Sequence, residues 1–258
     1  MTNEILLQAS TTMTNDYILN AYVSPDDPRD FIYSSDETVP STLDYRPEML
    51  PVRDQGKQGS CYAFCASSMK EFQELKNYGC NFYMSPQFIY NSRENLYDAT
   101  KTNDDGMYSR DVMKILHKKG VCAESDYPYG KEIDIKPPEE VAKKALNHVI
   151  KAYARVDTVR ELKQALYTNG PCLMTLPVYA RTTTMWKGGT ERLGGHAMCV
   201  VGYTRNGFIL RNSWGKNWGD KGHTIFPFED WGRHSQVWTC VDDELSKKIV
   251  KKRFLGCC

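Results

Sequence analysis

Hydrophobic residues recur at helical spacing in the first half of the chain. A run over residues 61–78, followed by the stop signal Gly79, carries Phe64, Ser68, Phe72 and Leu75 at that spacing. The Ser-Pro pair at 85–86 is typical of a helix N-cap with a first-turn proline. A third helix is predicted over residues 109–119. We therefore expect the segment 43–145 to form a mainly helical lobe.

The second half changes to a pattern typical of strands. Thr158 and Glu161 form a capping box that predicts one helix, ending near Tyr167. Asn206-Gly207 predicts a tight hairpin turn. The predicted strands cover residues 152–156, 172–179, 196–203, 208–212 and 224–228. The segment 146–242 is therefore expected to form a β-rich lobe.

Both ends of the chain are polar and have no clear period. Residues 1–42 are rich in Thr, Asn, Asp and Ser and, taken alone, predict a disordered leader. Residues 243–258 carry a basic cluster before the terminal pair Cys257-Cys258. A solvated basic tail is the simpler interpretation, and a lipid-modified Cys-Cys anchor is the alternative. Binding to a membrane is not the expected function.

Composition narrows the function classes. The 258 residues are 41% hydrophobic, enough for one large domain or two packed lobes. The net charge of +1 gives no indication of nucleic-acid binding. The nine cysteines form no C-x-x-C zinc pattern, so most are predicted to be reduced core thiols in an intracellular or cytoplasmic protein. No signal peptide is visible, although a secreted or lysosomal protein without its signal peptide would look the same.

Cys61 is the main candidate for chemistry. It follows a glycine-containing loop and begins the first predicted helix, where the helix dipole and unpaired backbone N–H groups favour a thiolate. A cysteine on an apolar helix is more often a small buried hydrophobic residue. A nucleophile also needs a base, a group that orients the base, and donors for an oxyanion.

The string Gly59-Ser-Cys-Tyr-Ala-Phe64 resembles the nucleophile motif of the papain-like cysteine peptidases. In that family histidine and asparagine follow about 130–150 residues downstream, and here His196 follows Cys61 by 135 positions. The Gly-Gly-His-Ala stretch at 194–197 is similar to cathepsin B-like members. The resemblance implies an α+β fold in which a helical N-terminal lobe and a β-rich, barrel-like C-terminal lobe flank a cleft that holds the active site. One departure is Gln58, which stands where the family usually has a disulfide-bonded cysteine.

The resemblance also implies four catalytic roles. Cys61 would be the nucleophile, and His196 its acid–base partner in a thiolate–imidazolium pair. Asn212, in the Asn-Ser-Trp-Gly string, would orient the imidazole. The Gln55 side chain and the Cys61 backbone N–H would bind the oxyanion. Any one of the five histidines, taken alone, is more often a surface or core residue; the order Gln, Cys, His, Asn favours catalysis.

Substrate-binding residues follow from the same resemblance. Gly106 would pair with the substrate backbone, and Met107 and Tyr108 would form the floor of a side-chain pocket. The remaining candidates, which surround the catalytic pair, are Gly195, Ala197 and Trp214. Asp105 replaces a second family glycine. The leader, residues 1–42, could act as a short propeptide that blocks the cleft, and this zymogen hypothesis competes with a mere tail.

The expected function is hydrolysis of peptide or protein substrates by an endopeptidase through a thioester intermediate, without metal or organic cofactor. Endopeptidase action is favoured because the sequence shows no two-histidine insertion of the kind found in cathepsin B. Peptide ligation or transamidation at the same site, and a catalytically idle binding protein, are the alternatives. Substrate preference is not predicted.

Overall fold

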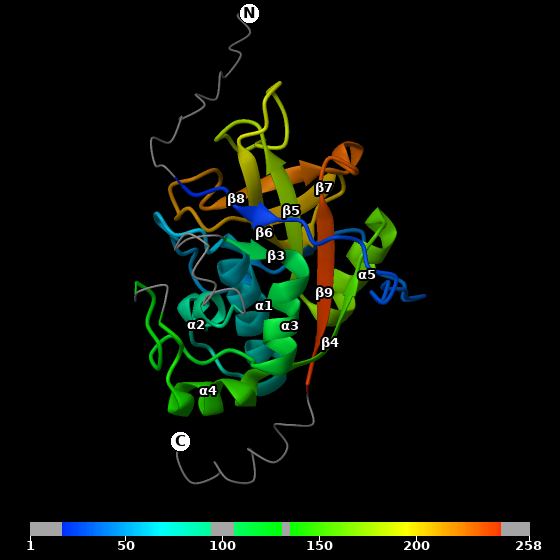
Figure 1. Cartoon of the computed structure of the whole chain (residues 1–258). Coiled ribbons are helices and arrows are strands. Elements are labelled where there is room, and N and C mark those ends of the chain that lie inside the picture. Colours follow the sequence, from blue (N-terminus) through cyan, green and yellow to red (C-terminus); the bar gives the residue numbers. More distant parts are fainter. Residues whose placement is uncertain (1–16, 94–105, 131–134, 244–258) are drawn as a thin grey trace, which may run out of the picture.

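The computed structural model describes residues 17–93, 106–130 and 135–243 (Figure 1). Its helices are α1 (Cys61–Tyr78), α2 (Pro86–Asn91), α3 (Ser109–Lys118), α4 (Glu139–Ala145) and α5 (Val159–Asn169), with 3-10 turns at Arg46–Glu48, Leu146–His148 and Phe228–Asp230. Its strands are β1 (Ala21–Tyr22), β2 (Leu43–Asp44), β3 (Met107–Tyr108), β4 (Ile150–Arg155), β5 (Cys172–Val178), β6 (Gly194–Tyr203), β7 (Gly207–Arg211), β8 (His223–Pro227) and β9 (Gln236–Asp242). The proposed lipid anchor at Cys257-Cys258 lies outside the described residues.

One antiparallel sheet dominates the molecule. Its strand order is β4-β9-β5-β6-β7-β8, and β2 pairs with the far end of β6. A hairpin joins β6 to β7 as predicted, but its turn lies one residue earlier than Asn206-Gly207, because Gly207 already belongs to β7 and its carbonyl accepts the Thr204 N–H over 2.8 Å. Because β2 comes from the segment 43–145, that segment contributes a strand to the sheet as well as most of the helices.

Two hydrophobic clusters cover the two faces of this sheet. Side chains alternate between the faces along a strand, and β6 follows this rule: Ala197, Cys199 and Val201 belong to one cluster, whereas Met198 and Val200 belong to the other. Helices α1 and α3 complete the first cluster, and α5 completes the second. In Figure 1 α1 and α3 accordingly lie on one side of the sheet and α5 near its other side.

Helix α1 is the central element of the first cluster. It begins at Cys61, as predicted, and ends before Gly79, which adopts a left-handed φ of 70°. The helix is buried over most of its length, so it also buries polar side chains. Lys70 satisfies its charge there through Glu74 and Asp242, both of them buried. This pairing allows a charged residue to lie inside a packed core.

Most of the predicted elements are present. Helix α3 and strands β5, β6, β7 and β8 lie within one or two residues of their predicted bounds. The capping box of α5 is confirmed, with the Glu161 N–H donating to Thr158 Oγ1 over 3.1 Å and the Thr158 N–H donating to the Glu161 carboxylate. The sequence reading missed α4 and β9. Strand β9 is buried at all but one residue, but its polar residues Gln236, Thr239 and Asp242 interrupt the apolar run and do not alternate with apolar ones, so the sequence gives no strand signal there.

Several buried cysteines fit the expectation of core thiols. Cys65, Cys122, Cys172, Cys199 and Cys240 are all buried and reduced. Burial raises the pKa of the Cys122 thiol to about 12, and that of Cys240 to about 12 as well. These thiols are therefore poor nucleophiles. Within the described residues, no helix combines the length and apolar character needed to cross a bilayer.

Candidate active site

Cys61 is the first residue of α1, the helix that packs against the strand carrying His196. Its side chain is fully buried. Ser60 precedes it as the N-cap, and the Ser60 carbonyl accepts the N–H of Phe64 to start the helix. Helix α1 packs against β6, and Cys61 shares a buried cluster with Ala197, the residue after His196. The helix that begins with the predicted nucleophile thus packs against the strand that carries the predicted histidine.

The imidazole of His196 is held from one side by Asn212. The His196 Nε2 and Asn212 Oδ1 atoms are 2.7 Å apart, so the ring nitrogen donates to the amide oxygen. Trp214 lies against the same ring, with centroids 4.5 Å apart. Because Nε2 carries the proton, Nδ1 is the basic nitrogen, and Nδ1 is buried without a hydrogen-bond partner among the described residues. This arrangement presents one basic nitrogen for proton transfer.

The protonation of His196 differs from the sequence-based expectation of an imidazolium. The pKa of His196 is lowered to about 4, mainly by burial and to a smaller extent by the Arg181 charge, while the Asn212 hydrogen bond only partly opposes this shift. The ring is therefore neutral near pH 7 in this structure. The physical reason is loss of solvent: His196 is fully buried, and a segment of the leader runs beside it.

Gln55 joins the two lobes at the site. Its backbone N–H donates to the Ser213 carbonyl over 2.9 Å, and its side-chain oxygen accepts the Ser213 hydroxyl over 2.6 Å. The side-chain nitrogen donates to the Gln58 carbonyl over 2.8 Å. Tyr129, which is not among the predicted site residues, supports this loop by donating to the Gln55 carbonyl. The amide is thereby fixed in one orientation.

The predicted substrate-binding glycines face a peptide backbone that belongs to the leader. Strand β1 pairs in parallel with β3 on one side, and Asn20 forms a parallel bridge with Gly195 on the other. A Cβ atom placed on Gly106 would lie 2.0 Å from the Asn20 carbonyl oxygen, and one on Gly195 would lie 2.1 Å from that of Ala21. Only glycine permits these approaches. The leader backbone thus fills the space between β3 and β6.

The side chains of the other predicted pocket residues are also in contact with the leader or close to it. Met107 is buried in the same cluster as Ala21 and Ala197. Tyr108 is partly exposed, and its ring lies 5.3 Å from that of Tyr22. Five of the six predicted substrate-binding residues therefore contact one continuous stretch of chain, residues 17–22, and the sixth, Ala197, shares a hydrophobic cluster with Ala21.

Tyr17 covers the Trp214 end of the site. Its ring stacks on Trp214 with centroids 4.5 Å apart and planes 5° apart. Its hydroxyl donates to Asp54 over 3.1 Å, and Arg181 donates to its carbonyl over 2.9 Å. Sequence reasoning did not select Asp54, Arg181 or Ser213. Of these three residues, only Ser213 stands in a recognised motif, the Asn-Ser-Trp-Gly string. Its place in that motif is the one sequence signal that could have selected it.

Comparison with known proteins places this chain in a family. The profile of the Papain family cysteine protease matches residues 39–230. An uncharacterised peptidase C1-like protein of Acanthamoeba polyphaga mimivirus is 29% identical over 79% of this chain and 73% of its own. Mouse cathepsin K is 30% identical over 72% of this chain and 59% of its own. The crystal structure of xylellain, a cysteine protease from Xylella fastidiosa, superposes with a TM-score of 0.76 at 28% identity, over 91% of this chain and all of that one.

The fold and the site therefore define a papain-like cysteine protease of the α+β class. The chain belongs to the papain family of cysteine proteases.

Proposed function

We propose that this chain is a latent cysteine endopeptidase whose own leader occupies the substrate site. The hydrogen bond between His196 and Asn212, on a strand packed against the helix that begins with Cys61, carries the catalytic part of the proposal. The leader backbone lying against Gly106 and Gly195 carries the regulatory part.

In the proposed mechanism, departure of the leader returns water to His196 and allows a proton to pass from Cys61 to the imidazole. The thiolate then attacks the carbonyl carbon of a peptide bond, and the oxyanion binds the Cys61 N–H and the Gln55 amide. His196 gives its proton to the leaving amine, which leaves a thioester on Cys61. A water molecule, deprotonated by His196, attacks the thioester and releases the acid product and the thiol.

The leader fits the role of inhibitor because it uses the same contacts that a substrate backbone would use. Its residues 19–22 lie between both walls, and the Leu19 carbonyl accepts the Gly195 N–H over 2.8 Å. Tyr17 blocks access along Trp214. We also propose an intracellular site of action, which the buried reduced thiols support.

Removing the leader tests both parts. The family match begins at residue 39, so a chain lacking residues 1–38 retains the whole matched domain and is expected to hydrolyse an unblocked fluorogenic peptide faster than the full chain. In this shortened chain Cys61→Ala should reduce turnover to background, whereas Cys65→Ala, at a buried thiol one helical turn away, should largely preserve it. Activity that survives Cys61→Ala refutes the catalytic assignment, and equal rates with and without the leader refute the inhibitory role.

Ligation or transamidation at the same thioester is the second candidate. It would need an amine to compete with water at the acyl-enzyme. Mass spectrometry of the products formed with and without an added amine nucleophile distinguishes it from hydrolysis.

A further inference from the structure

The leader continues beyond the cleft and folds into a turn of its own. The Asp30 N–H donates to the Asp27 carbonyl over 3.0 Å, with Pro28 as the first central residue. The Asp27 carboxylate accepts the backbone N–H of Arg29 over 3.0 Å, which closes the turn from inside. The turn fixes the backbone from which the Asp30 side chain projects. We call residues 24–33 the clasp.

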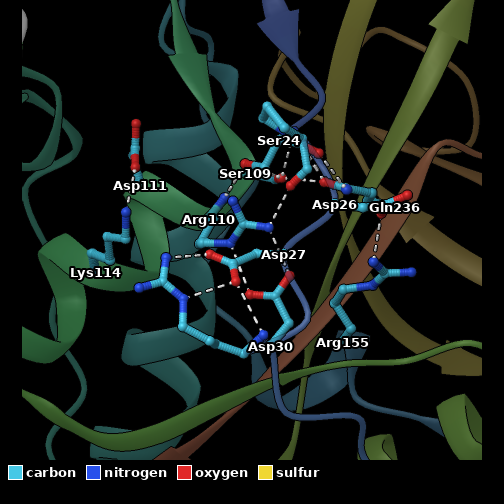
Figure 2. A network of polar contacts seen from close by, with 12 residues as sticks. Ser24, Asp26, Asp27, Asp30, Ser109, Arg110, Asp111, Lys114, Arg155 and Gln236 are labelled. Carbon is cyan, nitrogen blue, oxygen red and sulfur yellow. Dashed lines mark hydrogen bonds and ion pairs between the residues drawn. The ribbon is translucent and has the colours of Figure 1, made fainter.

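Asp30 uses that position to form a paired ionic contact with Arg110 on α3 (Figure 2). The Arg110 Nε and Nη2 atoms donate to its two carboxylate oxygens over 2.8 and 2.6 Å. Both side chains are largely buried, with exposed fractions of 12% and 7%. Arg110 also donates to the Pro25 carbonyl. A two-point contact of this kind, shielded from water, is stronger than an exposed ion pair.

Ser24 forms a second point of attachment. Its backbone N–H donates to the Gln236 side-chain oxygen over 3.2 Å, and its carbonyl accepts from the Gln236 side-chain nitrogen over 2.8 Å. Its hydroxyl accepts the backbone N–H of Arg110 over 2.9 Å, near the start of α3. The Ser109 hydroxyl donates its one proton to the Gln236 side-chain oxygen, and its oxygen lies 3.1 Å from the Ser24 hydroxyl oxygen. Figure 2 shows these groups converging from α3, β9 and the leader.

The end of the clasp adds to the edge of the main sheet. Ile32 forms a parallel bridge with Arg155 of β4, the edge strand. The Tyr33 N–H donates to the Arg155 carbonyl over 2.7 Å, and the Arg155 N–H donates to the Phe31 carbonyl over 2.8 Å. The leader thus satisfies backbone groups that an edge strand otherwise exposes.

We propose that Arg110, Ser109, Gln236 and the outer edge of β4 form a second peptide-binding site, outside the substrate cleft, whose ligand is the clasp. The site accepts an extended peptide that carries a carboxylate on a tight turn. Its purpose is to retain the leader after the chain is cut in residues 34–38, most of which are exposed. Activation then takes two events, cutting and dissociation. This inference rests on the proposed function of the leader as an inhibitor.

Asp26 provides a matched control for Asp30. Both are clasp aspartates paired to an arginine, but the Asp26 side chain is 88% exposed where it meets Arg155. Asp30→Asn is expected to speed dissociation of the cut leader by roughly 30-fold or more, because it breaks a buried, hydrogen-bonded charge pair. Asp26→Asn is expected to change it by less than about fivefold. Both substitutions lie in the leader fragment. Once the fragment has dissociated, the remaining domain therefore has the same sequence in every sample.

The experiment places the recognition sequence of a site-specific protease between Ser35 and Asp36 of the full chain. Cys61→Ala prevents self-cleavage while retention is measured. After cutting, size-exclusion chromatography with mass spectrometry reports whether the fragment stays bound, and release of a labelled fragment into excess unlabelled fragment gives the rate. With Cys61 intact, cut wild-type protein should remain largely inactive on a peptide substrate, and the Asp30→Asn protein should become active.

Immediate loss of the wild-type fragment on cutting overturns the inference, as does equal dissociation from the Asp30→Asn and Asp26→Asn proteins. Failure of the proposed function looks different. In that case the fragment is retained or released as described, but no sample hydrolyses peptide once the fragment has gone.

Discussion

The side-chain amide of Gln55 is held at both its oxygen and its nitrogen, which fixes it beside the amino end of α1. A primary amide has two N–H groups, so one can bind Gln58 while the other serves an oxyanion. In leader-free enzyme, Gln55→Ala should lower kcat by about 10²–10³ and leave KM within a few fold, because the lost contact forms only in the transition state. Steady-state kinetics on a peptide measures both constants.

Ser213→Ala is the control for this prediction. It removes the hydroxyl that holds the Gln55 oxygen but keeps the backbone bond between the two residues. Its effect on kcat should therefore be smaller than that of Gln55→Ala. A larger effect would mean that Ser213 itself acts in the reaction.

At the scale of single residues, the sequence identified the residues of the candidate site better than it identified the contacts between them. Motif and spacing selected Cys61, His196 and Asn212, and the structure places His196 and Asn212 in hydrogen-bond contact. The roles of these residues stay predictions. Arg181 could not be selected, because its link to the Tyr17 carbonyl depends on a contact between residues 164 positions apart. The neutral state of His196 could not be predicted either, because it follows from burial.

Helix α1 depends on buried charges for its packing. Lys70 is completely buried between Glu74 and Asp242, and His148 lies 3.1 Å from the second oxygen of Glu74. Lys70→Met leaves two buried carboxylates short of a cation and should lower the free energy of unfolding by about 3–5 kcal/mol. Urea denaturation of protein carrying Cys61→Ala measures this change.

Lys76→Ala provides the comparison on the same helix. Its pair with Glu48 is about half exposed, so the loss should stay below about 1 kcal/mol. Equal effects at the two lysines would show that the buried cluster contributes little beyond a surface pair.

Elements marked by a helical period, a cap or a continuous apolar run were predicted well, and elements without such a signal were not. Helix α3 is amphipathic, with Val112, Met113, Ile115 and Leu116 buried, and its pattern gave nearly correct bounds. The leader was ambiguous because its order comes from other segments: β1 has only two residues and pairs with β3, far along the chain. A strand of two residues leaves no periodic signal in the sequence.

At the scale of the whole molecule, we expect the leader to be coupled to the protonation of His196, because it runs beside the neighbouring Gly195. With the leader in place the pKa of His196 is about 4. Once the leader has gone and water reaches the ring, the pKa should return toward its ordinary value of about 6.5. The open form then binds a proton more readily than the closed form, so a fall in pH favours the open form.

Affinity for the leader should therefore be constant above about pH 6.5 and fall by up to tenfold per pH unit between about 6.5 and 4. The dissociation constant of a peptide comprising residues 1–35, measured between pH 7.5 and 4.5 on leader-free protein carrying Cys61→Ala, tests this expectation. His196→Gln should remove most of the slope, which separates the contribution of the imidazole from that of the clasp carboxylates. An affinity that stays constant down to pH 4.5, or a slope that survives His196→Gln, would show that the histidine does not link acidity to opening.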